Sequence, residues 1–402
     1  MLLGLGSLAL FLYNIGLPAA PYFDETHYVP AARALIEQSG PTNIEHPLFS
    51  KTLIAAGILI FGDNGLGWRL PSAVAGAIAV VALFWIALIL LRDVRSAALT
   101  ALLLVFNQTH FIQSRIAMLE MPMTACLLLG LGCFLQAQRG GGVHSKRWEF
   151  AGAIALGLAV GAKWLAIPYV ALFLGGLAWA KWQGSSRDKA HLADHIVPDT
   201  IKLGLVSLLT YLATFWPAFF YTKDPMTLSH LLGFQVEMLN VQRGHMSGHP
   251  YQSVWWQWPL MLRPIWYLFE KYGDIYRAVL LVGNPVIYWG GLVTVALAVS
   301  GWMKERKEGL WIAVILYVFS FLIWILIPKE VEFFYYYNLS AIWLCLVIGA
   351  FFGSFGDRGK RWLGWFTIAS AIMFAYFYPI ISAQALPADD TWTNWVWMKS
   401  WY

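Results

Sequence analysis

The chain has 402 residues, of which 59% are hydrophobic and only 12% are charged. Soluble domains carry about 25% charged residues, so a soluble fold would lack polar surface and the composition indicates an integral membrane protein. The net charge of +5 does not indicate a nucleic-acid partner, because the basic residues are scattered over short loops. The three cysteines lie in apolar runs, so we expect no disulfide framework.

Eleven apolar runs approach the length of about 20 residues that a helix needs to cross a bilayer. They cover residues 1–17, 67–91, 95–110, 118–137, 149–163, 165–181, 200–220, 277–301, 309–328, 332–352 and 361–382. The first run lacks the basic start and cleavage site of a signal peptide. We therefore predict an all-α integral membrane fold with about eleven transmembrane helices.

Two long segments between these runs, 18–66 and 221–276, fall on the same side of the membrane. We expect them to be loops with short interfacial helices. No internal repeat is visible, so we treat residues 1–382 as a single polytopic domain and 383–402 as a C-terminal tail on the outer side.

The charge pattern orients the chain. With a cytoplasmic N-terminus, the cytoplasmic loops hold 15 of the 27 Lys and Arg residues, as the positive-inside rule predicts. The opposite side holds 14 of the 22 acidic residues. Both long loops, and any chemistry that uses their carboxylates, are thus predicted to face away from the cytoplasm.

The first long loop gathers ionisable residues near the membrane surface. Asp24 and Glu25 precede a predicted short helix with an apolar stripe, Glu45 and His46 precede a second one, and Arg69 opens the next span. Ionisable groups at membrane depth are usually paired or functional. We expect Asp24 to lie at the head of its helix, where backbone N–H groups could fix its side chain. Helix capping alone is the plainer interpretation.

Further polar and aromatic residues occur in other loops predicted on this side or near the ends of spans. Glu120 and Arg115 lie at the outer boundary between two spans, Lys163 lies near the turn of a predicted hairpin, and Lys329 lies in a short turn. The second long loop contributes His249, Trp255, Trp256, Trp258 and Arg263. These aromatic residues are typical either of an interfacial belt or of a platform for sugar or peptide.

This residue set suits glycosyl transfer from a lipid phosphate. A phosphate diester leaves without an acid, but an acceptor hydroxyl needs a positioned carboxylate base. The departing phosphate needs cations as its charge develops, and a single displacement inverts the anomeric carbon. A transporter would place charges near the midplane, often with repeats.

Several motifs resemble the protein O-mannosyltransferases and their bacterial relatives, which include the aminoarabinose transferases and are all C-type membrane glycosyltransferases. The resemblance rests on FDETHY, NIEHPLFSK, FGDNGLGWRLPS, SRIAMLEMP, GLAVGAKW, HPYQSVWWQWPLMLRPIWY and FFYYYN. The tryptophan-rich motif is similar to the protein-mannosyltransferase branch. The β-trefoil insertion of the eukaryotic enzymes is absent, which favours a prokaryotic-type enzyme of the plasma membrane.

The resemblance implies roles for individual residues. Asp24 would be the catalytic base, supported by Glu25, and Glu120 would be a second acid at a position where the family usually has Asp. The carrier phosphate would contact Arg69, Lys163 and Lys329. We add Arg263 of the second long loop to these cations, because a membrane-anchored phosphate needs positive charges at the interface. The donor would be a polyprenyl-phosphate sugar, most simply mannose, and the acceptor a Ser/Thr hydroxyl of a protein. A lipid or glycan acceptor is the alternative.

Two further sites are considered from the sequence: an acceptor-binding cleft and a metal site. We place Glu45, His46, His249 and the tryptophans of the second long loop in the acceptor cleft. No cofactor is required by the chemistry. A divalent ion, Mg²⁺ or Zn²⁺, could bind at Glu45 and His46, but only if these two side chains converge with Glu25, His245 and His249.

Overall fold

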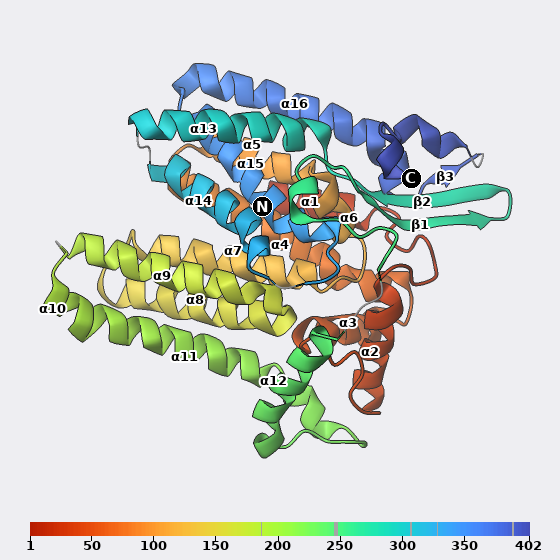
Figure 1. Ribbon diagram of the computed structural model, residues 1–402, viewed down its shortest axis with the longest axis horizontal. Coiled ribbons are helices and arrows are strands. Elements are labelled where there is room, and N and C mark those ends of the chain that lie inside the picture. The colour runs from red at the N-terminus through yellow and green to blue at the C-terminus, as the bar shows by residue number, and fades with distance from the viewer. Residues whose placement is uncertain (186, 245–247, 306–307, 328, 388–389) are drawn as a thin grey trace. The chain divides into compact units, whose positions relative to one another are not determined.

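The computed structural model describes residues 1–402 except 186, 245–247, 306–307, 328 and 388–389 (Figure 1). The chain is mainly helical and divides into two compact units. The first unit comprises Met1–Phe23, Leu83–Ile116 and Gly244–Tyr402, and the second comprises Asp24–Ala82 and Ala117–Arg243. The helix α4 (Gly65–Leu91) begins in the second unit and ends in the first.

The second unit combines long helices with the two helices of the first long loop. Its long helices are α7 (Glu120–Ala137), α8 (Gly142–Ala162), α9 (Ile167–Gly184) and α11 (Val197–Ala213). In Figure 1 α8, α9 and α11 lie side by side, and α7 packs against α8. The shorter α10 (Lys189–His191) precedes α11.

The short helices of this unit are α2 (Glu25–Glu37), α3 (Phe49–Phe61) and α12 (Leu228–Gln242). The helix α2 confirms the predicted apolar stripe, because Tyr28, Ala31 and Ala32 are buried. It packs against α3. Both helices of the first long loop are therefore present where the sequence predicts them.

The first unit is built around α15 (Asn338–Gly353), whose residues up to Ala350 are all buried. Around it pack the helices α5 (Val94–Val105), α13 (Gly291–Glu305), α14 (Glu308–Leu322) and α16 (Gly356–Ile381). The short helices α1 (Leu2–Leu12) and α6 (Gln108–Gln113) complete it. A helix that is apolar all round is expected at such a central position.

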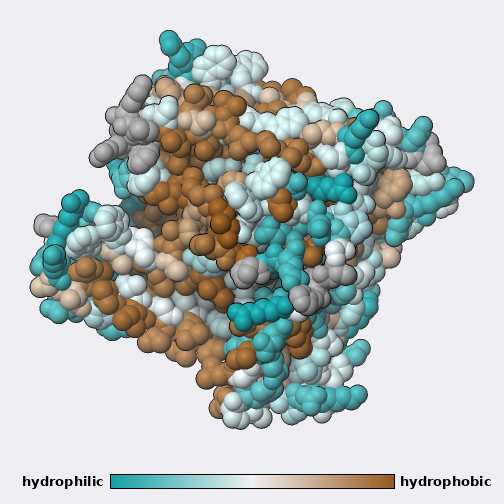
Figure 2. Space-filling view, viewed as in Figure 1, coloured by the Kyte–Doolittle hydropathy of each residue, from teal (hydrophilic) through white to brown (hydrophobic). Residues whose placement is uncertain are grey.

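Seven helices in the part of the chain that the structure describes are long and apolar enough to cross a membrane, and four shorter apolar helices accompany them. The protein is therefore an integral membrane protein with several spans. Hydrophobic side chains cover much of the surface along the helices, as Figure 2 shows. The exposed residues of α11 include Ile201, Leu205, Leu208 and Leu209, apolar side chains that suit contact with lipid.

The all-α prediction is wrong in one respect, because the fold also contains β-strands. The strands β1 (Ile265–Tyr272) and β2 (Ile275–Leu281) form an antiparallel hairpin, and β3 (Ala385–Leu386) pairs with β2. Gly273 in the two-residue turn has φ +61°, a conformation that favours glycine in tight hairpins. The predicted span 277–301 therefore starts too early, because its first residues belong to β2.

The segment after α16, which we expected as a tail, is tied into the first unit. Besides β3 it contains Trp401, which is buried. The indole N–H of Trp401 donates to the Met261 carbonyl at 2.6 Å, and the indole of Trp266 donates to the Trp401 carbonyl at 2.8 Å. These contacts fix the chain end to the base of the hairpin.

Candidate active site

Asp24 is the residue that immediately precedes α2. Its backbone is helical (φ −66°, ψ −13°), and its side chain makes no capping hydrogen bond. The expectation that backbone N–H groups fix this carboxylate is therefore wrong, since a capping residue normally has an extended backbone. Instead, the Tyr28 hydroxyl donates to Asp24 Oδ2 at 3.3 Å. The carboxylate is left available for another partner.

The surroundings of Asp24 favour its protonated form. Burial is the main cause that raises the pKa of Asp24 from 3.8 to about 6, and the neighbouring Glu120 carboxylate raises it further. Lys163, His27 and the Tyr28 hydroxyl oppose this rise. A carboxylate with a pKa near neutrality is a better proton acceptor than an ordinary one, as general bases require.

Glu120 and Lys163 form an ion pair beside Asp24. Glu120 is the first residue of α7, and Lys163 stands in the extended connection that follows α8. Both side chains are almost fully buried, and Lys163 Nζ donates to Glu120 Oε1. The other oxygen, Oε2, has no hydrogen-bond partner among the described residues. The structure thus brings together three of the predicted site residues: Asp24, Glu120 and Lys163.

Glu25 and Arg69 form a second, fully buried ion pair. The Arg69 guanidinium donates from Nε and Nη2 to the two carboxylate oxygens of Glu25 at 2.8 and 2.9 Å. Glu25 Oε1 also accepts the N–H of Ala117 at 2.8 Å. This arrangement anchors the start of α2 to α4 and to the segment before α7. Glu25 directly follows Asp24 as the first residue of α2, so this ion pair fixes the backbone next to Asp24.

The loop before α3 is held from within by Lys51. Its side chain is fully buried, and its ammonium donates to the carbonyls of Asn43, of His46 at 2.8 Å and of Thr42 at 3.5 Å. Sequence reasoning assigns no role to Lys51. A single lysine inside the apolar run of an amphipathic helix was the available signal, because such a charge must find partners when it is buried.

Glu45 and His46 lie in this loop, and both are partly exposed. Glu45 accepts a hydrogen bond from the Asn43 amide. No group of three or more His, Cys, Asp or Glu side chains in the described ranges could hold a metal ion, whereas zinc takes three or four protein ligands. The pair does not fit a zinc site built from described residues. His245, one of the required partners, lies outside them.

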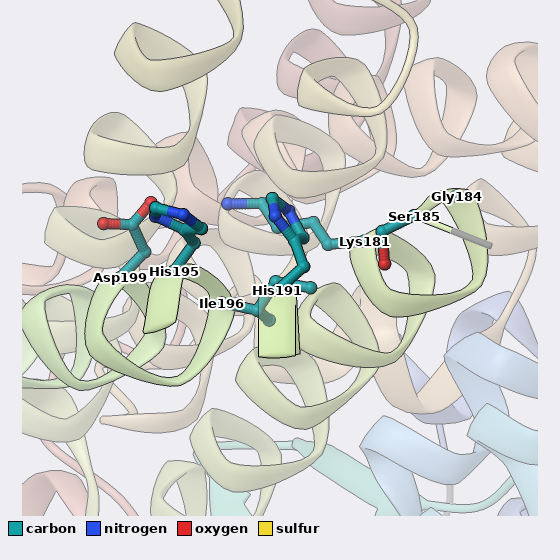
Figure 3. A pocket seen from close by; sticks show the side chains of 7 residues that line it. All are labelled: Lys181, Gly184, Ser185, His191, His195, Ile196 and Asp199. Atoms are coloured by element: carbon teal, nitrogen blue, oxygen red, sulfur yellow. The ribbon is translucent and has the colours of Figure 1, made fainter. Parts of the chain in front are cut away.

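Two cavities in the second unit lie at opposite ends of α11. The first is lined by 14 residues of the first long loop and of the segment 218–237, and His46 is among them. The second lies where α9 ends and α11 begins (Figure 3). There the rings of His191 and His195 are 4.9 Å apart, and Lys181 pairs with Glu149. This second cavity contains none of the predicted site residues.

Lys329 and the five predicted residues of the second long loop all belong to the first unit. Lys329 is exposed, donates to the Tyr336 hydroxyl at 2.9 Å and lies 4.7 Å from the centre of that ring. Glu332 accepts the N–H of Trp255 at 3.2 Å. Burial raises the pKa of Glu332, while the Trp255 N–H and Lys329 oppose the rise.

The remaining second-loop residues have different environments. Trp258 is fully buried and donates to Ser253 Oγ at 2.9 Å. It is a core residue, so its assignment to the acceptor cleft is wrong. Trp256 is 51% exposed and His249 is also exposed, so both can reach a ligand. Arg263 donates to the Pro250 carbonyl at 2.7 Å and, more weakly, to that of Ser400.

Comparison with known proteins agrees with the resemblance seen in the motifs. Residues 59–221 match the family model for dolichyl-phosphate-mannose-protein mannosyltransferases, and residues 227–401 match the C-terminal four-transmembrane region of protein O-mannosyltransferases. The polyprenol-phosphate-mannose–protein mannosyltransferase of Mycolicibacterium smegmatis is 26% identical over 99% of this chain and 91% of its own length.

Solved structures show the same fold. The S. cerevisiae protein O-mannosyltransferase Pmt1-Pmt2 complex, bound to the sugar donor, superposes with a TM-score of 0.86 at 12% identity, over 99% of this chain and 91% of that one. ArnT from Cupriavidus metallidurans bound to undecaprenyl phosphate gives 0.62 at 17% identity, over 92% and 62%. Together, the two family models, the full-length relative and the common fold show that the chain is an enzyme of the protein O-mannosyltransferase family of membrane glycosyltransferases.

Proposed function

We propose that this enzyme transfers mannose from a polyprenyl-phosphate carrier to a Ser or Thr hydroxyl of a protein, with inversion at the anomeric carbon. The observation that carries the proposal is the Asp24 carboxylate. It makes no helix cap, has a pKa raised to about 6 and lies beside the buried pair of Glu120 and Lys163. The relative from Mycolicibacterium smegmatis bears the name of the same reaction.

In the proposed reaction, Asp24 accepts the proton of the acceptor hydroxyl as its oxygen attacks the anomeric carbon. The bond between that carbon and the phosphate oxygen breaks, and both of its electrons leave with the polyprenyl phosphate. The attack comes from the face opposite the leaving group, so one displacement inverts the centre. The phosphate leaves without an acid, because its own negative charge is stable once cations balance it.

The cations proposed for the phosphate are Lys163, Arg263 and Lys329. Lys163 is paired with Glu120, whereas Lys329 is exposed and donates to the neutral hydroxyl of Tyr336. Arg69 was predicted as a fourth phosphate contact. Its two hydrogen bonds to Glu25 support a role in positioning the start of α2 instead of phosphate binding. The exposed His249 and Trp256 remain proposed contacts of the acceptor, with Trp255 beside them.

Mass spectrometry of the products tests the proposal. The purified enzyme is incubated with a defined polyprenyl-phosphate mannose and either Ser/Thr peptides or lipid and glycan acceptors. A peptide heavier by one hexose is the expected product. Modified lipid or glycan without modified peptide would support the alternative acceptor. Donor binding without any product would instead support a transporter or carrier.

We also propose that the N-terminus is cytoplasmic and that the site faces away from the cytoplasm, in a prokaryotic plasma membrane. The basic loops near Arg187 support this orientation through the positive-inside rule. An Arg187→Cys variant should react with an impermeant thiol reagent only after the membrane is opened. Reaction from outside in intact cells would reverse the topology.

A further inference from the structure

The cavity beside the first long loop has a volume of about 510 Å³, within the range of about 300–1,000 Å³ that is usual for ligand sites. Three stretches form its wall: residues 41–48, residues 218–227 and one face of α12. The floor is apolar and consists of Ile44, Leu48, Ala218, Tyr221, Met226 and Phe234. All but Ile44 are less than 9% exposed.

The rim of this cavity is polar. It carries the carboxylates of Asp224 and Glu237 and the imidazoles of His46 and His230. Asp224, Glu237 and His230 are exposed, and His46 is partly exposed. His230 Nε2 lies 2.8 Å from Glu237 Oε1. An apolar floor with a few polar groups around it is the usual composition of a binding site.

Hydrogen bonds fix the walls before any ligand arrives. The buried Lys51 ammonium donates to the loop carbonyls of Thr42, Asn43 and His46. The Gln242 amide at the end of α12 donates to the Glu45 carbonyl at 2.6 Å. Thr222 donates to the Gln38 carbonyl at 2.7 Å from its N–H and at 2.9 Å from its hydroxyl. A site that is already formed avoids part of the ordering cost of binding.

Two contacts connect the cavity to the proposed base. The ring of His46, which lines the cavity, meets the ring of Tyr28 edge-on at 5.9 Å. The hydroxyl of the same Tyr28 donates to Asp24 Oδ2. A peptide bound in the cavity would therefore be separated from the Asp24 carboxylate, the proposed base, by the contacting rings of His46 and Tyr28.

We propose that this cavity is a subsite for the acceptor polypeptide. It binds an apolar side chain near the modified Ser or Thr on its floor, and a basic side chain of the same peptide at the Asp224 and Glu237 rim. The inference rests on the proposed function, because it presupposes a protein acceptor. It adds which neighbouring residues the enzyme selects.

The chemistry of the cavity favours a peptide over the other molecules at hand. An isoprenoid chain is a continuous hydrocarbon and gains nothing from two carboxylates and two imidazoles at the rim. A sugar needs several directed polar groups around its hydroxyls, and the floor here is apolar. A peptide with one apolar and one basic side chain matches both parts.

Filling the cavity is the first test. In Met226→Trp the larger side chain occupies the floor, since Met226 is 7% exposed and lines the cavity. The matched control is Leu232→Trp, on the exposed face of α12, where Leu232 is 67% exposed and an interfacial tryptophan is tolerated. The substrates are Ser peptides that carry one leucine at successive positions before or after the serine, with an all-alanine reference.

The wild type and Leu232→Trp should prefer leucine at one position, with a KM lower than that of the reference by about ten- to a hundred-fold, the range for full burial of an aliphatic side chain. Met226→Trp should lose this preference and keep its KM for the polyprenyl-phosphate mannose. An unchanged preference in Met226→Trp would overturn the inference, as would a higher donor KM alone, which would make the cavity a lipid site.

Charge substitutions at the rim provide a second, gentler test. Asp224 has φ +50°, a conformation that asparagine also adopts readily, and Glu237→Gln keeps a hydrogen-bond partner for His230. With paired peptides that differ by lysine or glutamine, Asp224→Asn plus Glu237→Gln should raise KM for the lysine peptide about two- to five-fold for each carboxylate, as for exposed ion pairs. Equal KM changes for both peptides would overturn the rim assignment.

The two levels of the proposal fail differently. If the wild type modifies a lipid or glycan but none of the peptides, the protein-acceptor function itself is wrong. If the wild type modifies peptides and Met226→Trp selects them as the wild type does, the function stands and only this subsite is wrong.

Discussion

Asparagine at position 24 keeps the size of the Asp24 side chain but cannot accept a proton. Loss of a general base lowers turnover by about 10²–10⁴-fold, so Asp24→Asn should retain donor binding and lose nearly all transfer. The Asp24 side chain accepts a long hydrogen bond from the Tyr28 hydroxyl, and the amide oxygen of asparagine can still accept it. The loss of activity should therefore not come from a loss of structure.

The same substitution should stabilise the protein. The pKa of Asp24 rises from 3.8 to about 6 on folding, so its favourable contribution is present at low pH and is lost as pH rises from about 4 through 6. Each unit of pKa difference between the folded and unfolded states corresponds to about 1.4 kcal/mol. Above pH 6, the charged form of Asp24 therefore lowers the free energy of unfolding by about 3 kcal/mol. Its partial exposure reduces this to about 1–2 kcal/mol.

Two measurements check this reasoning on purified full-length protein at about pH 7.5. Thermal unfolding followed by intrinsic tryptophan fluorescence should give Asp24→Asn a Tm equal to or above that of the wild type, by a few degrees for about 1 kcal/mol. Transfer to a Ser peptide should fall at least 100-fold. An active Asp24→Asn variant, with more than about a tenth of wild-type turnover, would refute the assignment of the base. A large drop in Tm would show that Asp24 is structural.

Three further predictions concern the neighbours of Asp24 and the carrier phosphate. Glu120→Gln removes a charge that raises the pKa of Asp24. The acid limb of the rate–pH profile, expected at about pH 6 in the wild type, should therefore move to lower pH. An unchanged acid limb would show that Glu120 does not influence the ionisation of the catalytic base. Arg69→Ala leaves Glu25 buried without its main charge partner and should lower stability by about 3–5 kcal/mol in thermal unfolding, whereas a stable variant with weaker donor binding would return Arg69 to the phosphate site. Lys329→Ala should weaken binding of polyprenyl phosphate by about 1.5–3 kcal/mol, the value of a hydrogen bond to a charged group, measured by titration; unchanged affinity would remove Lys329 from the donor site.

The helices of the first long loop could be predicted from the sequence because their signal is local. The spacing of Tyr28, Ala31 and Ala32 indicates an apolar face whatever lies elsewhere in the chain, and the structure confirms it. The role of Glu25 could not be predicted in the same way. Its partner Arg69 is 44 residues away, and periodicity carries no information about pairs at that distance.

The hairpin was missed for a different reason. A fully buried strand and a membrane helix both appear as continuous apolar runs, so residues 277–281 were joined to the span that follows them. The sequence does contain a hairpin signal: aromatic and β-branched residues on both sides of Gly273 and Asp274. The burial of Trp258 was likewise hidden, because a tryptophan in a loop motif does not reveal whether it faces solvent or the core.

Lys51 stabilises the loop before α3 through hydrogen bonds to its main chain, so the conformation of that loop depends little on most of its side chains. The ammonium donates to the main-chain carbonyls of Thr42, Asn43 and His46, groups that every amino acid has. Thr42 and Ile44, which line the adjacent cavity, can therefore be randomised in a library without unfolding the loop, provided that Lys51 is kept. This loop is a place where directed evolution could exchange acceptor preference while the catalytic carboxylate stays in position.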